Sequence, residues 1–429
     1  MASAPDVLPV SIIVPTFNRA ELLREAITSL LEQNRPAAQI LIVDDGSTDD
    51  TATVAAAFGE KLSYARLETN EGKAVALNRG LRLAKQAYVW IFDDDDVADP
   101  AALERLYQAL AARPDCGFAY GLCDRFTGPW PAPTTPPYRA YGSAQRAPLY
   151  IRLLEEHFIW QGALLVRRRC YEEVGAFNAS LLRSQDYEMV LRLAARFEGV
   201  AVPHILFHQR QHSGLRGPSK LKLKATELLD SWKSFDQIVL RAIHESHELG
   251  EFLSVPPQAD LALREQMTAL IQRGAIMARA GAWDLASADM LAAAERARQT
   301  AALSLNSQEM SALRRIFERW ARSAFSSAAE GRNFFAAIDA FEPARLRNAI
   351  KAALVWPVLY RVKKLLRDDE RTAQARELAL ILRCAGPAAL VHAVAQRKLR
   401  AEPLVVPINA GQVNLRSSAF RSSHPQGAE

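Results

Sequence analysis

The sequence predicts an α/β domain built on a doubly wound mixed sheet, followed by an all-α C-terminal part. Up to about residue 217, short apolar runs alternate with amphipathic helical segments, as they do in βαβ units. After the pair Gly217-Pro218 the composition changes to Ala, Leu, Arg and Glu, and β-branched runs become rare. Polar turns follow three of the apolar runs, two of these turns are rich in acids, and the functional predictions come from the three turns.

Three short apolar runs in the first hundred residues, rich in β-branched or aromatic residues, are predicted to be strands of the sheet; they occupy residues 10–14, 40–43 and 88–92. Residues 62–67 can supply a further strand. Asn18 is predicted to cap the first helix, whose apolar face runs from Leu22 to Leu31. Right-handed βαβ connections should bring the turns at residues 16–19, 44–50 and 93–96 to one edge of the sheet. Further strands are predicted near residues 118–120 and 160–168.

Four consecutive aspartates, Asp93 to Asp96, follow the strand predicted at residues 88–92. Adjacent carboxylates repel one another unless a positive charge lies among them, and oxygen ligands suit a hard cation such as Mg²⁺ or Mn²⁺. Ligands of open α/β sheets bind at the carboxyl edge, where such a cation would hold a diphosphate. A solvated turn before a helix that begins at Asp99-Pro100 explains the same residues, so both interpretations stay open.

Composition and charge are those of an ordinary globular protein. The 429 residues are 49% apolar and 24% charged, and the net charge of +5 permits an acidic partner or membrane surface without requiring one. No nucleic-acid partner is expected. The four cysteines are scattered, without a C-x-x-C pair, so reduced thiols are expected. No signal peptide and no apolar stretch of membrane-spanning length is apparent, which predicts a cytoplasmic protein.

Four segments resemble the successive signatures of family 2 glycosyltransferases, which have the nucleotide-sugar-binding GT-A fold. They occur in the family's order at residues 11–19 (SIIVPTFNR), 42–49 (IVDDGSTD), 70–73 (NEGK, with Ala76 and Asn78 following) and 93–96 (DDDD). The resemblance covers about residues 10–215. It implies the GT-A (nucleotide-diphospho-sugar transferase) fold and an enzyme that transfers a sugar.

The resemblance also implies a role for individual residues. Asp45, helped by Asp44, would accept a hydrogen bond from the uracil N–H, although a turn role with Ser47 also suits Asp44. Asp95 would coordinate Mg²⁺ or Mn²⁺, and Asp93 would bind the ribose or the metal. The residues implied to bind the nucleotide sugar are Pro15, Thr16, Asn18, Asp44, Asp45, Lys73, Asp93 and Asp94. Of these, Lys73 would lie near the phosphates or be a surface lysine at a helix end, and Asp94 occupies a position that the family leaves variable.

The acceptor side is implied by residues 184–194 (SQDYEMVLRLA), which resemble the family's E-D motif at the start of a helix. Gln185 replaces the usual Glu, but the acid at Asp186 is kept. Asp186 would be the catalytic base, or alternatively an acid that the helix dipole stabilises. In residues 207–214 (FHQRQHSG), His212 rather than His208 would complete the metal or diphosphate site.

A proline-rich stretch at residues 128–137 is predicted to be an extended loop over the edge of the site. Its Trp130, together with Tyr138, could stack on a sugar, or the loop could pack against the domain surface. Both alternatives stay open.

The implied reaction moves a sugar from a nucleoside diphosphate sugar, a UDP-sugar by the resemblance, to a hydroxyl of a glycan, a lipid-linked or a protein acceptor. The metal would stabilise the leaving diphosphate, and Asp186 would remove the acceptor proton, which gives inversion. Polysaccharide biosynthesis is the implied setting. No P-loop or nucleophile motif argues for a kinase or hydrolase, and residues 16–19 lack the basic triphosphate loop of a nucleotidyltransferase. A non-catalytic nucleotide-sugar-binding scaffold that acts through its helical half is the alternative.

The predicted division is a catalytic domain at residues 1–217, a helical accessory domain at 218–342, a basic helical region at 343–409 and a disordered tail at 410–429. Helices are predicted at residues 220–247, 261–280, 283–299, 308–328 and 334–340. Residues 343–367 contain seven Lys or Arg and no acid around an apolar centre with Trp356 and Tyr360. This segment could lie on the inner face of the membrane as a peripheral contact, or form a packed core with a basic outer face. Pro357 is predicted to interrupt its helix.

Overall fold

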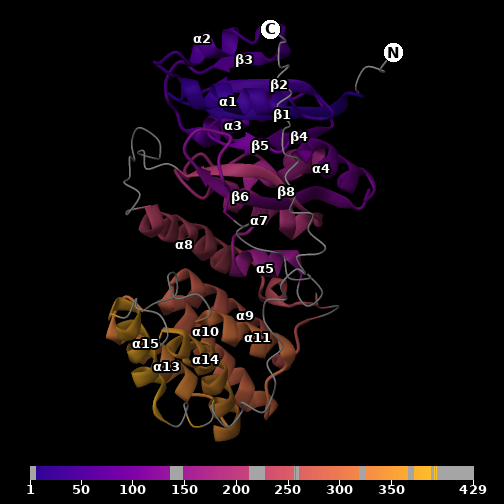
Figure 1. Cartoon of the computed structure of the whole chain (residues 1–429). Coiled ribbons are helices and arrows are strands. Elements are labelled where there is room, and N and C mark those ends of the chain that lie inside the picture. Colours follow the sequence, from indigo (N-terminus) through magenta and orange to yellow (C-terminus); the bar gives the residue numbers. More distant parts are fainter. Residues whose placement is uncertain are drawn as a thin grey trace, which may run out of the picture.

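The structure is a computed structural model of the chain, and it describes residues 6–135, 148–211, 228–255, 257, 260–317, 325–365, 372–387, 391 and 393. A sheet with helices on both faces forms the N-terminal part, and a group of helices forms the C-terminal part (Figure 1). The long helix α8, Leu228–Ser246, lies between them (Figure 1). The predicted order of an α/β part and an all-α part is confirmed.

The N-terminal part is built on an eight-stranded mixed sheet with the order β3-β2-β1-β4-β7-β6-β8-β5. Neighbouring strands from β3 to β4 are parallel, whereas β7 is antiparallel to both β4 and β6. This is the mixed sheet of a GT-A fold. The strands are β1 Leu8–Thr16, β2 Ala37–Asp44, β3 Ser63–Arg66, β4 Tyr88–Ile91, β5 Val97–Ala98, β6 Cys116–Thr127, β7 Leu164–Arg167 and β8 Glu198–Gln211. Strands β1 to β4, β6 and β7 confirm the predicted ones.

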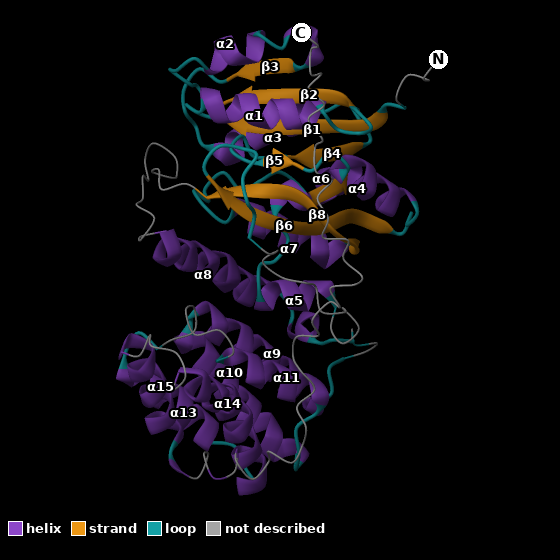
Figure 2. Cartoon of the chain, in the orientation of Figure 1, coloured by secondary structure: helices purple, strands orange, loops and turns teal. Residues whose placement is uncertain are grey.

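Helices cover both faces of the sheet (Figure 2), and for this reason the central strands are apolar without alternation. In β1, Ile12 and Val14 join one buried cluster, while Ile13 joins the other. Leu23 and Leu103 pack on the first face, and Leu77 packs on the second. The helices of this part are α1 Ala20–Leu31, α2 Thr51–Ala56, α3 Lys73–Leu83, α4 Ala102–Ala111, α5 Leu149–Glu155, α6 Arg168–Val174 and α7 Gln185–Arg196.

The C-terminal part consists of helices in the residues that the structure describes. They are α9 Leu263–Ala280, α10 Trp283–Thr300, α11 Ser307–Ile316, α13 Ala328–Asp339, α14 Ala344–Leu365 and α15 Thr372–Ala385. The single helix predicted over residues 308–328 is wrong. Residues 325–327 are not helical, and α13 begins afresh because the Ser327 hydroxyl accepts a hydrogen bond from Glu330 N at 3.2 Å.

The prediction that Pro357 interrupts its helix is also wrong, because α14 continues through it. A proline inside a helix costs about 3 kcal/mol. Burial of Leu354, Val355 and Val358, each fully inaccessible to solvent, offsets that cost. These three apolar side chains thus lie in a packed core, as one of the two sequence interpretations required. The Tyr360 side chain, most of residues 388–409 and the predicted tail lie outside the described residues.

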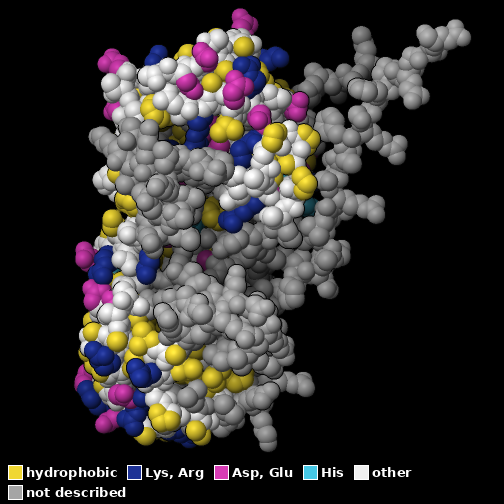
Figure 3. All heavy atoms as spheres, turned by 60° about the vertical axis from the view of Figure 1, so that its left-hand side comes forward, with side chains coloured by type: hydrophobic (Ala, Val, Ile, Leu, Met, Phe, Trp, Pro, Cys, Tyr) yellow, Lys and Arg dark blue, Asp and Glu magenta, His cyan; other side chains and the backbone are white. Residues whose placement is uncertain are grey.

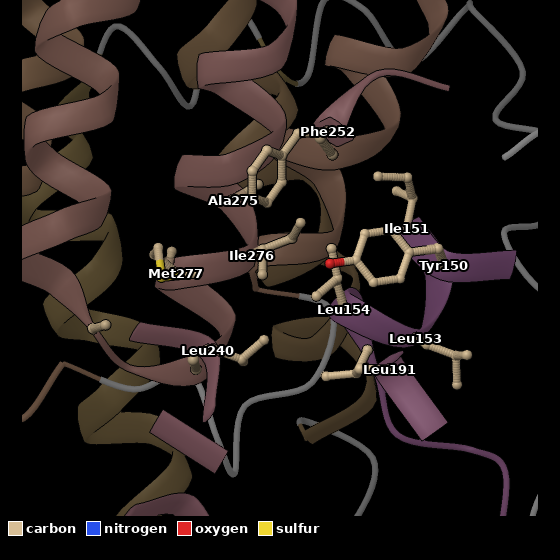
Figure 4. Close-up of a cluster of buried hydrophobic side chains, with 14 of the residues drawn as sticks. Tyr150, Ile151, Leu153, Leu154, Leu191, Leu240, Phe252, Ala275, Ile276 and Met277 are labelled. Atoms are coloured by element: carbon tan, nitrogen blue, oxygen red, sulfur yellow. The ribbon is translucent and has the colours of Figure 1, made fainter. Parts of the chain in front are cut away.

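The two parts of the chain share one buried cluster (Figure 4). Leu154 of α5 and Leu191 of α7 come from the N-terminal part, and Leu240 of α8 and Ile276 of α9 come from the C-terminal part. Helices α8 and α9 are therefore packed against the face of the sheet that carries α3, α5 and α7.

Surface and thiol features bear on the remaining predictions. Acidic, basic and apolar side chains are interspersed over the helical half on the face shown in Figure 3. Among the described helices, none has both the length and the apolar character that crossing a bilayer requires. The cysteines are free thiols, and Cys116, Cys123 and Cys170 are buried.

Candidate active site

A cavity of about 700 Å³ lies where β1, β2 and β4 end. Its walls come from the turns after these strands, from the start of α7, and from α8 and α9 of the helical half. The predicted site residues that line it are Pro15, Thr16, Asn18, Asp45, Lys73, Asp93, Asp94, Asp95 and Asp186. The structure therefore brings together residues that are up to 171 positions apart in the sequence, from Pro15 to Asp186.

The acidic loop, residues 93–96, points three carboxylates at one another. One oxygen each of Asp93, Asp95 and Asp96 lies within 4.8 Å of the other two. Asp94 instead pairs with Arg19. The predicted D-x-D pair thus gains a third member, Asp96, which the family resemblance does not assign to the site. Three carboxylates form the all-oxygen donor set that Mg²⁺ and Mn²⁺ accept.

Like charges and burial both disfavour the ionised form of aspartates in the acidic loop. Burial raises the pKa of Asp96 well above its ordinary value, and the charges of Asp95 and Asp93 raise it further. Burial also raises the pKa of Asp94, although the charge of Arg19 opposes that shift. A divalent cation among these carboxylates would favour their charged forms.

Two basic side chains partly neutralise the loop. Arg19 Nη1 donates to Asp94 Oδ1 at 2.8 Å and to Asp95 Oδ2 at 3.0 Å. Lys73 Nζ donates to Asp93 Oδ1 at 2.5 Å. Burial lowers the pKa of Lys73, but the charges of Asp93, Asp186 and Asp95 outweigh burial and leave the pKa above its ordinary value. Lys73 is therefore a charged cavity residue rather than a surface lysine, and Asp186 lies close enough to act on it.

Arg210 of β8 holds the acidic loop in place. Its backbone N–H donates to Asp96 Oδ1 at 2.9 Å, and its Nε donates to the Asp95 carbonyl at 3.0 Å. Its remaining guanidinium nitrogens donate to the Gly128 carbonyl and to Glu25, each at 2.5 Å. The site residue predicted in this segment is a histidine, His212, and not Arg210.

Asp45, the first residue after β2, organises the loop that leads to Lys73. It accepts hydrogen bonds from Asn70 Nδ2, Glu71 N and Gly72 N, each at 2.8 Å. Burial raises the pKa of Asp45, although the two backbone N–H groups lower it. The second signature segment, residues 42–49, is thus hydrogen-bonded directly to the third, residues 70–73.

Asp44 lies below the cavity and does not line it. Its carboxylate accepts from Ser47 N at 2.8 Å and from the Tyr64 hydroxyl. These contacts match the turn role that the sequence left open for Asp44.

The prediction that Asn18 caps α1 is wrong. Asn18 has a left-handed φ of 52°, which asparagine tolerates, and its Oδ1 accepts from Thr48 N at 2.7 Å. The helix is capped from another turn, because Ala20 N donates to Asp49 Oδ2 at 3.1 Å. Asn18 therefore ties the turn after β1 to the turn after β2, and it still lines the cavity.

Asp186 is the second residue of α7 and is partly buried. Its Oδ1 accepts from Tyr187 N at 2.9 Å, and the residue before the helix, Ser184, has a left-handed φ of 58°. The position at a helix N-terminus stabilises the carboxylate form of an acid. Asp186 faces the cavity that the acidic loop also lines.

The described part of the chain gives no cavity contact for the predicted histidine or for the predicted aromatic loop residues. His212 and Tyr138 lie outside the described residues. His208 Nδ1 pairs with Asp124 at 2.6 Å, and Trp130 stacks on the His208 ring with centroids 4.4 Å apart. Trp130 thus has the packing contact that was the alternative to a sugar contact.

The helical half supplies cavity residues that no sequence motif indicated. Lys233 and Asp236 come from α8, and Arg279 comes from α9. Only the packing of the two parts brings these residues to the site, so their order in the sequence carried no signal for it.

Relatives of known family match the same part of the chain. The profile described as glycosyl transferase family 2 matches residues 11–175. The uncharacterized glycosyltransferase RP339 of Rickettsia prowazekii (strain Madrid E) is 30% identical over 233 residues, which is 53% of this chain and 71% of that protein. The uncharacterized glycosyltransferase YibD of Escherichia coli (strain K12) is 32% identical over 242 residues, which is 51% of this chain and 70% of that protein. The chain spans 38% of the length of a similar protein from Rickettsia felis (strain ATCC VR-1525 / URRWXCal2).

A solved structure, S. aureus TarS 1-349 in complex with UDP-GlcNAc, is similar over 92% of this chain and 93% of that chain, with 14% identity and a TM-score of 0.44. That score is too low to support a conclusion, so the fold assignment rests on the strand order and the family match. The identities to RP339 and YibD, over more than two thirds of each protein, show the family directly. The chain belongs to glycosyltransferase family 2.

Proposed function

We propose that the chain is an inverting, metal-dependent glycosyltransferase that moves a sugar from a UDP-sugar to an acceptor hydroxyl in glycan or polysaccharide synthesis. The observation that carries this proposal is the shared cavity, which the acidic loop and Asp186 both line. A transferase needs a place for the leaving diphosphate and a base for the acceptor, and these two features supply them. The acceptor is a glycan, a lipid-linked or a protein molecule.

The donor end of the cavity is the region of Pro15, Thr16 and Asp45. Each carboxylate oxygen has about two acceptor sites, and among the described residues Asp45 Oδ1 accepts a hydrogen bond from Glu71 N. The uracil N–H would take the second site. Arg19 and Lys73, which pair with the acidic loop, would lie near the diphosphate and balance its charge.

The acidic loop fits a hard divalent cation. Asp93, Asp95 and Asp96 would hold it, because their oxygens already converge and the pKa of Asp96, raised by burial and by its acidic neighbours, marks a place where positive charge is missing. A bound Mg²⁺ or Mn²⁺ would supply Lewis-acid stabilisation of the leaving diphosphate.

Asp186 would remove the proton from the acceptor hydroxyl. Its carboxylate lies in the first turn of α7, close enough to Lys73 for the two charges to interact. A single base opposite the leaving group gives one displacement and inverts the anomeric centre.

The test is UDP release by the full chain from UDP-glucose, UDP-galactose, UDP-GlcNAc and UDP-glucuronate, each with Mn²⁺, Mg²⁺ or EDTA. We expect release from at least one donor with a metal and its loss in EDTA. Asp186→Asn should lower kcat by about 100-fold or more. The matched control is Glu188→Gln, because Glu188 lies on the same helix but pairs with Arg192 at 2.7 Å.

Three outcomes would contradict parts of the proposal. Full activity of the Asp186→Asn variant would show that Asp186 is not the base. Unchanged UDP release in EDTA would show that the reaction needs no metal. Proton NMR of the sugar product would contradict inversion if it showed the anomeric configuration of the donor. UDP binding without turnover of any donor would favour the scaffold alternative.

A further inference from the structure

Helix α8 of the helical half contacts Ser184, which lies two residues before Asp186. The Ser184 hydroxyl donates to Asp236 Oδ1 at 2.7 Å, across 52 residues of sequence. Both side chains are buried, with 9% of each residue exposed. The contact joins the two parts of the chain at the wall of the cavity.

The backbone at Ser184 is in a conformation that needs support. Ser184 has φ 58° and ψ 16°, a left-handed conformation that is unfavourable for a non-glycine residue unless its surroundings fix it. A serine at this position commonly accepts a hydrogen bond from its own helix, but the Ser184 side chain makes no such cap. Its hydroxyl is committed to Asp236 instead.

The left-handed residue sets the direction in which α7 starts. The Ser184 carbonyl accepts from Glu188 N at 2.9 Å, which is the first bond of the helix, and Asp186 stands on the turn that this bond closes. A change in the Ser184 backbone would therefore tilt the first turn and move the Asp186 carboxylate.

Asp236 is itself held firmly, because α8 is docked at several points beyond it. Gln237 Nε2 donates to the Ala280 carbonyl at 2.7 Å, and Leu240 is buried in the shared cluster of Figure 4. Arg241 pairs with Asp284 of α10 at 2.7 Å. The helical half thus presents Asp236 from a fixed position.

We infer that Asp236 is a positioning residue: through its hydrogen bond to Ser184 it aims the Asp186 carboxylate at the acceptor, so the catalytic centre is incomplete without the helical half. This inference rests on the proposed role of Asp186 as the base. It gives the C-terminal helices a direct part in the reaction.

The test compares variants of the full chain by UDP release from whichever UDP-sugar the wild type turns over with Mn²⁺. Asp236→Ala should lower kcat by about 10- to 100-fold, the effect of misplacing a catalytic group by about 1 Å, and leave the KM for the donor within about twofold. Asp236→Asn keeps an oxygen that accepts from Ser184, so it should retain kcat within about threefold of the wild type. Ser184→Ala should lower kcat as Asp236→Ala does, and the double variant should lose no more than either single one.

The matched control is Asp284→Ala, which removes the contact of α8 between Arg241 and Asp284, two residues that do not line the cavity. It should keep wild-type kcat, and thermal unfolding of all variants shows whether each is folded. Wild-type kcat in Asp236→Ala, an equal loss in Asp236→Asn, additive losses in the double variant, or an equal loss in Asp284→Ala would each overturn the inference. A wild-type chain that binds no UDP in calorimetry would instead refute the proposed function.

Discussion

Asp95→Asn should weaken cation binding by more than about tenfold. It should leave the fold intact, because the charges around Asp95 nearly balance. Asp95 Oδ2 lies 3.0 Å from Arg19 Nη1, an attraction of about 5.5 kcal/mol at an effective dielectric constant of about 20. The same carboxylate lies within 4.8 Å of Asp93 and Asp96, a repulsion of at least about 3.5 kcal/mol from each charged partner at the same dielectric constant. Because burial and its acidic neighbours raise the pKa of Asp96, between one and two of these repulsions operate. The attraction and the repulsion cancel to within about 2 kcal/mol.

Thermal unfolding and calorimetry separate the two effects. We expect the free energy of unfolding of Asp95→Asn to stay within about 2 kcal/mol of the wild-type value. In the presence of UDP, its affinity for Mn²⁺ should fall by more than about tenfold, because a direct ligand matters at least as much as the groups that orient one. The control is Asp115→Asn, which removes the same charge from an exposed pair with Arg113 at the start of β6.

The reasoning would be refuted if Asp95→Asn bound Mn²⁺ with UDP as the wild type does. It would also be refuted if the variant unfolded while Asp115→Asn did not, because the balance of charges would then be wrong.

Three further predictions follow from the contacts at the site and in the core. Asp45→Ala leaves Glu71 N and Gly72 N without an acceptor, so it should lower the free energy of unfolding by about 1.5–3 kcal/mol and weaken UDP binding in calorimetry; unchanged stability would contradict the contacts. Burial and the charges of Asp95 and Asp93 raise the pKa of Asp96, and protons compete with the cation for its carboxylate. The affinity for Mn²⁺ should therefore fall as the pH falls, and this loss should begin above the pH range in which an ordinary aspartate titrates. An affinity that changes only within that ordinary range would count against Asp96 as a ligand. Burial raises the pKa of the Cys123 thiol to about 12, so iodoacetamide at pH 8, where about one thiol in ten thousand is ionised, should alkylate Cys123 only after denaturation.

Local sequence patterns were sufficient for the elements that position the donor end. Strands β1, β2 and β4 are continuous apolar runs that end in polar turns, so their carboxyl edge and the convergence of Asp45 and Asp95 could be predicted. The resemblance added Asp186, which periodicity alone would have left as an ordinary acid at a helix start.

Long-range partners were not predictable from local pattern. The turn after β1 predicts a cap at Asn18, yet Asp49 caps α1, because two turns distant in sequence fold against each other. Asp96 could not be separated from Asp94 before Arg19 was seen to pair with Asp94. Pro357 lies inside a helix because burial outweighs the local preference, and Asp236 reaches the cavity only through packing of the two parts.

A cavity that holds both the cation site and Asp186 can be tested directly with a fluorine label at position 186. The label would be attached to the new cysteine of an Asp186→Cys, Cys384→Ser variant, because the remaining cysteines are buried. The control is a Leu303→Cys, Cys384→Ser variant, since Leu303 is 61% exposed in the helical half. With Mn²⁺ and UDP we predict strong paramagnetic broadening of the label at position 186 and little at position 303. Equal broadening at both positions, or none at position 186 while calorimetry shows Mn²⁺ and UDP bound, would contradict the shared site.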